Sequence, residues 1–177
     1  MFRQARIFLI VWCLAACLGI FASESAQATG APLRTAFLPF MFTDTSLPAP
    51  GAKPEAADVA RLHLVDTEVQ QRLVGSGEYA AVDIARIARA IRDNDLVGCD
   101  SCAVSLAREV GAEAVLYGWV QKVSDLIINM TILVRSVKTG QIIAAGNASL
   151  RGDTDIAWKR GAVWLIAHRL LPAEAGR

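Results

Sequence analysis

Three successive strand-like segments in the C-terminal half limit the folds open to this chain. Residues 114–123 and 126–137 are mostly apolar, and Ser124-Asp125 between them is typical of a tight turn. Apolar and polar side chains alternate in the second segment, as in a half-buried strand. Lys138-Thr139-Gly140 indicates a hairpin turn into a third strand over 141–150. This pattern predicts an antiparallel meander of three strands.

The remaining sequence alternates between helical periodicity and short strands. Strands are predicted over 34–40 and 79–82, and helices begin at Pro54, Asp83, Asp100 or Ser101, and Thr154. Residues 41–54 contain three prolines and a glycine and are expected to form a long loop that offers a contact surface. We therefore predict an α/β (α+β) fold, with about four helices covering a mixed sheet that ends in the meander.

Composition excludes several classes of protein. The chain has 177 residues, of which 54% are apolar and 20% charged, so it is not expected to be disordered. Eighteen basic residues balance seventeen acidic ones, whereas nucleic-acid binding would favour a basic excess. The length suits a single domain.

The N-terminal residues have the pattern of a secretory signal. Arg3 and Arg6 precede an apolar run over 7–21, and Ala26-Gln27-Ala28 follows with small residues at the cleavage positions. We predict a signal peptide over 1–28 and one exported, periplasmic domain over 29–177, with its core over 34–171.

An alternative interpretation of the same segment is a lipoprotein signal. Leu14-Ala15-Ala16-Cys17 has the form of a lipobox, which would make Cys17 the lipidated first residue of an outer-membrane lipoprotein. A third possibility is that the apolar segment is retained as an anchor. Membrane association is expected only in these two cases.

Cys99 and Cys102 form the only motif with intrinsic reactivity. In an oxidising compartment we expect a structural disulfide between them, which would stabilise the fold by about 2 kcal/mol. A redox pair and half of a metal site are the alternatives, because a thiol in the first turn of a helix has a lowered pKa. His63 and His168 are far apart in sequence, so neither a metal site nor a cofactor is predicted.

The segment after the third meander strand is dense in special residues. It supplies the candidate partner-binding residues Arg151, Asp153, Asp155, Trp158 and Arg160. A helix start offers free N–H groups, and an arginine can form a bidentate fork with an anion. The alternative is a purely structural strand-to-helix corner, in which Asp153 caps the helix and Trp158 packs beneath it. No catalytic constellation is complete, so an enzyme is not predicted.

Three short motifs carry a family resemblance: 37–40 (Phe-Leu-Pro-Phe), 114–120 and the hairpin 137–143. In this order they resemble the α/β domain shared by the amino-terminal part of TolB and by CsgG. Residues 99–161 are also similar to a family of exported proteobacterial proteins with a domain of unknown function. That resemblance implies an accessory role beside periplasmic quinoprotein alcohol-oxidation systems.

The sequence therefore favours a non-catalytic periplasmic accessory or binding protein with an envelope protein as its partner. Two alternatives stay open. One is a thiol–disulfide redox protein using Cys99 and Cys102, and the other is an outer-membrane lipoprotein in envelope assembly.

Overall fold

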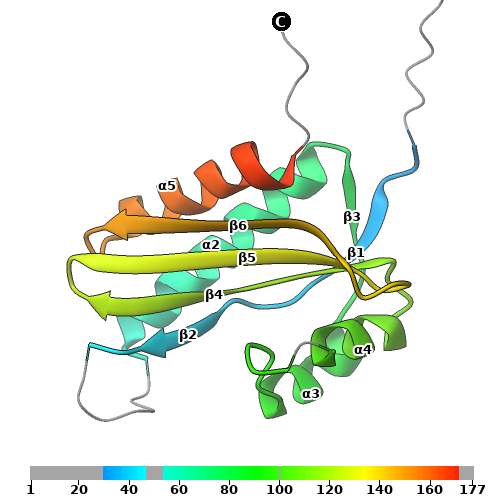
Figure 1. Ribbon diagram of the computed structural model, residues 1–177, viewed down its shortest axis with the longest axis horizontal. Helices are drawn as coiled ribbons and strands as arrows, with labels where there is room; N and C mark the ends of the chain where they lie inside the picture. The colour runs from blue at the N-terminus through cyan, green and yellow to red at the C-terminus, as the bar shows by residue number, and fades with distance from the viewer. Residues whose placement is uncertain (1–29, 47–53, 100, 172–177) are drawn as a thin grey trace, which may run out of the picture. The chain divides into compact units, whose positions relative to one another are not determined.

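A mixed six-stranded sheet organises the computed structural model, which describes residues 30–46, 54–99 and 101–171. The strands are β1 (Leu33–Phe37), β2 (Met41–Asp44), β3 (Tyr79–Ala81), β4 (Ala114–Ser124), β5 (Ile127–Ser136) and β6 (Ile142–Arg151). They lie in the order β3-β1-β4-β5-β6, and β2 also pairs with β4 (Figure 1). Strand β1 is parallel to β3 and β4, while β4, β5 and β6 are antiparallel. The predicted mixed sheet and its C-terminal meander are confirmed.

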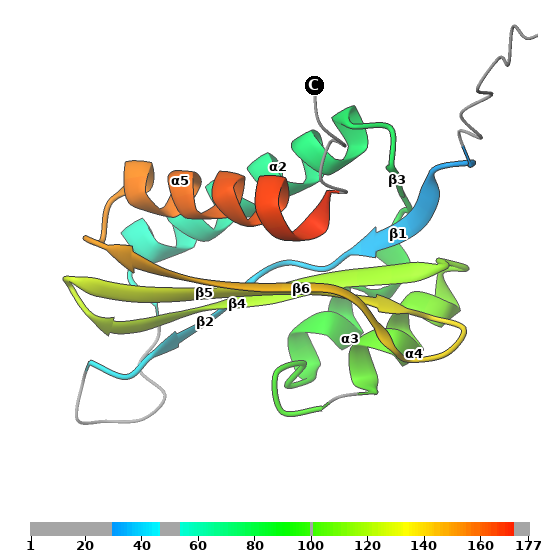
Figure 2. The same ribbon diagram turned by 45° about the horizontal axis from the view of Figure 1, so that its top comes forward.

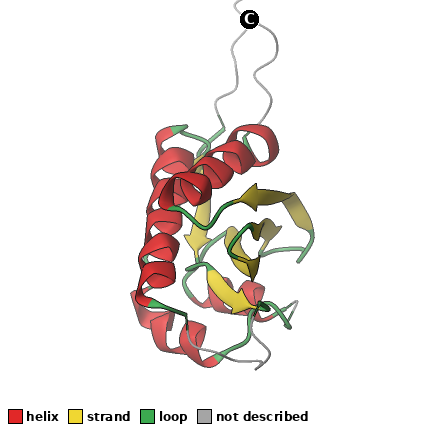
Figure 3. Cartoon of the chain, turned by 90° about the vertical axis from the view of Figure 1, so that its left-hand side faces the viewer, coloured by secondary structure: helices red, strands yellow, loops and turns green. Residues whose placement is uncertain are grey.

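Helices cover both faces of the sheet. Those of the described residues are α2 (Ala56–Gly75), α3 (Ala88–Asp93), α4 (Cys102–Glu109) and α5 (Asp155–Leu165), with short 3-10 and π segments at Ala85–Ile87 and Ile166–Leu170. Figure 2 shows α2 and α5 on one face and α3 and α4 on the other. Seen from the end in Figure 3, α2 runs along the first of these faces. Each face has its own apolar core, as expected for a layered α/β fold.

The alternation in β5 explains which face is buried. Ile128, Met130, Ile132 and Val134 are all buried in the core beneath α2 and α5. Across β6, the partners of these residues are small or aliphatic, so the two helices can approach the sheet closely. A Cβ atom added at Gly161 of α5 would overlap the side chain of Leu150.

The predicted strand over 34–40 and the loop over 41–54 are wrong in part. Strand β1 ends at Phe37, and a new strand, β2, begins at Met41 and runs parallel to β4. Pro39 separates the two strands, because proline cannot donate a ladder hydrogen bond. Phe42 of β2 then stacks on Trp158, with their ring centroids 6.2 Å apart. Residues 47–53 of the predicted loop lie outside the described residues.

The last helix also differs from its prediction at both ends. Its N-cap is Thr154, whose side chain accepts a hydrogen bond from the backbone N–H of Ala157 at 3.2 Å, so the predicted cap at Asp153 is wrong. The predicted helix to Leu171 becomes a π-helical segment after Leu165. Asp153 is thereby free to point into the fold.

A carboxylate on α2 holds the connection between β1 and β2. Asp66 Oδ1 accepts a hydrogen bond from the backbone N–H of Phe40 at 2.8 Å. Burial raises the pKa of Asp66 to about 6, although this hydrogen bond and the nearby His63 oppose the rise. The folded chain therefore keeps a proton on Asp66 that the unfolded chain has already lost.

We expect Asp66→Asn to stabilise the protein at neutral pH by about 1 kcal/mol. Because the pKa of Asp66 is higher in the folded state, stability due to this group is present at low pH and is lost as the pH rises from about 4 to about 6. Asparagine keeps the acceptor for Phe40 and carries no charge. Urea unfolding should show the gain at neutral pH and no gain near pH 4. The exposed Asp93→Asn is the control, and a destabilised Asp66→Asn at neutral pH would contradict the account.

Candidate functional site

The turn from β6 into α5 places Asp153 at the centre of a polar network. Gly152 has a φ of 88°, which turns the chain, and Asp153 follows with its side chain only 11% exposed. Its Oδ1 accepts from Arg61 Nη1 at 2.9 Å and from Trp158 Nε1 at 2.9 Å. Its Oδ2 accepts from Lys122 Nζ at 2.8 Å. One carboxylate therefore ties together α2, β4 and α5.

Arg61 and Lys122 complete this network, and the sequence analysis missed both. Arg61 Nη1 also contacts Asp58 Oδ1 at 3.2 Å, and its Nε donates to Asp155 Oδ1 at 3.0 Å. The hydrogen bond to Asp153 raises the pKa of Lys122 above its usual value, against the opposing effect of burial. We call Asp58, Arg61, Lys122, Asp153, Asp155 and Trp158 the corner network.

Trp158 is the apolar member of the corner network. The residue is fully buried, with its ring near Phe42 on one side and the Arg61 guanidinium 5.9 Å from its centroid. Its indole N–H is satisfied by Asp153. Of the predicted partner-binding residues, Asp153 and Trp158 therefore lie inside the fold, and Asp155 is held at its rim by Arg61.

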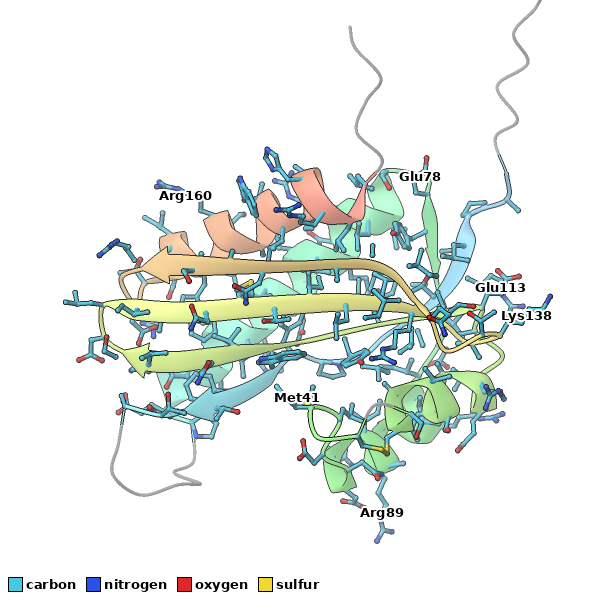
Figure 4. All side chains as sticks on the ribbon, viewed as in Figure 1. Met41, Glu78, Arg89, Glu113, Lys138 and Arg160 are labelled. Atoms are coloured by element: carbon cyan, nitrogen blue, oxygen red, sulfur yellow. A yellow bond between two sulfur atoms is a disulfide. The ribbon has the colours of Figure 1, made fainter. Side chains whose placement is uncertain are left out.

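The other two predicted residues lie on the surface beside this network. Arg151 at the end of β6 and Arg160 on α5 are exposed, and neither forms an ion pair with a described residue. Arg160 extends outward from α5 (Figure 4). Both line a groove of about 500 Å³ between the two elements. The other lining residues are Asn147, Ala148, Ser149, Leu150, Ala157, Gly161 and Trp164. We call this the β6–α5 groove.

Trp164 gives the β6–α5 groove an aromatic wall. Its side chain is 41% exposed, although large apolar side chains of this fold are mostly buried. The ring stacks on His168 with centroids 4.8 Å apart, and the Arg169 guanidinium lies 5.6 Å from its centroid. The groove thus combines exposed aromatic surface with free positive charge.

The two cysteines of the mature domain are joined by a disulfide between Cys99 and Cys102. Cys102 is the first residue of α4, on the sheet face opposite the β6–α5 groove. The predicted pairing is therefore present in the structure, while a redox role stays a prediction. Among the described residues no group of three His, Cys, Asp or Glu side chains could hold a metal ion.

Other sequence predictions concern residues that the structure does not describe. The signal peptide over 1–28 and the lipidation site Cys17 lie outside the described ranges. No helix within those ranges is long and apolar enough to cross a membrane.

Comparison with protein families gives the chain its place. A family model described as "Protein of unknown function (DUF2380)" matches residues 33–170. The chain belongs to this family, DUF3280. The matched range includes the corner network and the β6–α5 groove, so both are parts of the DUF3280 domain. None of the curated proteins matches the sequence.

Several solved structures are similar to this DUF3280 chain at low identity. The LpoB C-terminal domain from Salmonella enterica is 18% identical, with 81% of this chain and 93% of that chain covered and a TM-score of 0.49. The lipoprotein GNA1162 from Neisseria meningitidis is 15% identical, with coverages of 70% and 84% and a TM-score of 0.48. PelC from Paraburkholderia phytofirmans, solved as a dodecamer, is 14% identical, with coverages of 80% and 88% and a TM-score of 0.47.

Proposed function

We propose that this DUF3280 protein is a non-catalytic accessory module that binds an envelope protein through the β6–α5 groove. The observation that carries the proposal is the pair Arg151 and Arg160. Both are exposed beside a groove of about 500 Å³ and have no ion pair with a described residue. Exposed charges and an aromatic ring around a groove are typical of a recognition surface.

The corner network supports this proposal by fixing the groove in place. Asp153 follows directly on β6 and bonds to α2, β4 and α5, so the two walls of the groove cannot shift independently. Its cations and carboxylates neutralise one another at short range. We infer that the network serves stability and that Arg151, Arg160 and Trp164 serve recognition.

The proposal includes export of the domain. The pattern of residues 1–28 supports a cleaved signal peptide and a periplasmic domain over 29–177. The lipobox ending at Cys17 supports the alternative, an outer-membrane lipoprotein whose domain is the same. Association with a quinoprotein alcohol-oxidation system stays a prediction from the family resemblance.

Cross-linking within the cell envelope tests the groove. A photo-reactive residue at Ser149, which is exposed and lines the groove, should give a discrete cross-linked protein. The double variant Arg151→Glu/Arg160→Glu should lose this product, because it reverses the charge of both free arginines. The protein's own abundance reports whether the variant folds.

A matched double variant controls for net charge. Arg92→Glu/Lys138→Glu changes the charge by the same amount at two exposed residues away from the groove. Lys138 lies in the turn at the opposite end of β6 (Figure 4). It should leave the cross-link intact. A product that survives reversal of Arg151 and Arg160, or that disappears equally in the control, would overturn the proposal.

A further inference from the structure

Strand β6 forms one edge of the sheet. It pairs with β5 from Ile127↔Arg151 to Arg135↔Ile142, and within the described residues nothing pairs with its other side. An edge strand presents a row of unpaired N–H and C=O groups, which another extended chain can use as a template. The β6–α5 groove runs along this strand.

The edge of β6 lacks the usual protection against pairing. Edge strands are commonly short, interrupted by proline or bulges, or rich in charged side chains. Strand β6 has ten residues, contains no proline, and has Arg151 at its end as its only charged residue. Its one irregularity of register lies at the hairpin end, where Val134 and Arg135 of β5 pair with it. Its central part, from Ala144 to Leu150, is therefore regular and carries small side chains.

Helix α5 adds a second wall to the edge strand. Ala157, Gly161 and Trp164 recur at spacings of four and three, so they share the helix face that lines the groove. Gly161 allows this helix to lie close to Leu150. An open strand edge beside a helix is the arrangement in which PDZ and PTB domains bind an extended peptide as an additional strand.

The charges of this region indicate what kind of peptide fits. The two acidic residues nearest the groove, Asp153 and Asp155, are bonded to cations of the corner network. Arg151 and Arg160 are therefore uncompensated, and Arg169 adds a third positive charge beside Trp164. A second copy of this chain would bring only another arginine on its own β6. Charge complementarity favours a partner whose extended segment carries carboxylates.

We infer that the β6–α5 groove binds an extended, carboxylate-bearing segment of a partner protein as an additional strand on β6. This inference rests on the proposed function and specifies the chemistry of the partner. Backbone hydrogen bonds to β6 hold the segment, and Arg151 and Arg160 receive its carboxylates as bidentate ion pairs. The ring of Trp164 covers an apolar side chain of the segment.

Synthetic peptides of about six residues, the usual length of a strand, provide the probe. One panel alternates glutamate with valine, threonine or phenylalanine, and a matched panel carries lysine in place of glutamate. With the full chain as the cell processes it, acidic peptides should bind and slow amide hydrogen exchange in β6. The lysine panel should do neither.

Two double variants connect this binding to the arginines. Arg151→Gln/Arg160→Gln should weaken binding of the acidic peptides about tenfold, as expected for the loss of two exposed ion pairs. Arg92→Gln/Lys138→Gln should leave it unchanged. Thermal unfolding of both variants verifies that each remains folded.

Four results would overturn the inference. They are failure of the whole acidic panel to bind, binding without protection of β6, equal binding of the lysine panel, and protection of β6 by self-association before any peptide is added. If these occur while the cross-link from Ser149 still depends on Arg151 and Arg160, the groove still binds a partner, but not as an added strand. Loss of both signals would remove the proposed function as well.

Discussion

Asp153→Ala should lower the free energy of unfolding by about 3 kcal/mol or more, because it removes one member of a buried ion network and leaves the others unpaired. Lys122 and Asp153 side chains are each 11% exposed, so water compensates little for the lost carboxylate. Trp158 also loses the acceptor of its indole N–H. Chemical denaturation of the purified protein, monitored by circular dichroism, measures the change.

Two further variants separate the charge network from other effects at this turn. Asp155→Ala removes a side chain that is 70% exposed and has one partner, so its cost should stay below about 1 kcal/mol. Adding Lys122→Met to Asp153→Ala should recover part of the loss, because the orphaned buried cation is removed as well. If Asp153→Ala and Asp155→Ala were equally mild, Asp153 would not be the centre of the network.

Trp158→Ala should cost about 3 to 5 kcal/mol, which is typical for truncation of a fully buried aromatic side chain. The change leaves a cavity between Phe42 and Arg61 and removes one of the three hydrogen bonds to the Asp153 carboxylate. Urea unfolding is again the measurement, with the tryptophan replaced by circular dichroism as the probe.

Trp164→Ala is the matched control for Trp158→Ala. Trp164 is 41% exposed, so its truncation should cost less than about 1 kcal/mol while removing the aromatic wall of the groove. Trp158→Phe should be intermediate, since it keeps the ring against Phe42 and loses the indole N–H. Equal destabilisation by Trp158→Ala and Trp164→Ala would contradict the division between core and recognition surface.

The meander could be predicted from sequence because its signal is local. The alternation of β5 and the two turns that flank it are each contained within a few residues, and the structure confirms them. Strand β2 was missed for a different reason. It has four residues, follows Pro39 and pairs with β4 far along the chain, so it has no periodicity of its own. Parallel pairing leaves little trace in such a short segment.

The corner network shows the same limit at the level of the site. The sequence singled out Arg151, Asp153, Asp155, Trp158 and Arg160 because they cluster after β6. It could not separate them into buried and exposed groups, because the partners that bury Asp153 lie 92 and 31 residues away in the chain. Arg61 looked like an ordinary charged residue on an amphipathic helix. A charged residue paired with Asp58 three positions earlier was the available signal.

The groove itself was not predicted, because it is formed by one exposed edge and one helix face together. Trp164 was considered for a binding platform, and the sequence favoured a place in the core. Its exposure follows from its position on α5, on the groove side of the buried Leu165. Which face of a terminal helix stays uncovered depends on the sheet beneath it, and no local pattern records this.

Hydrogen–deuterium exchange of the protein within its own envelope fraction, compared with the purified protein, tests the central claim most directly. The account predicts that the envelope slows exchange in β6 and α5 and leaves α3 and α4 unchanged. Arg151→Glu/Arg160→Glu should abolish this difference, and Arg92→Glu/Lys138→Glu should preserve it. Protection confined to α3 and α4, or identical exchange in both states, would contradict a partner-binding groove between β6 and α5.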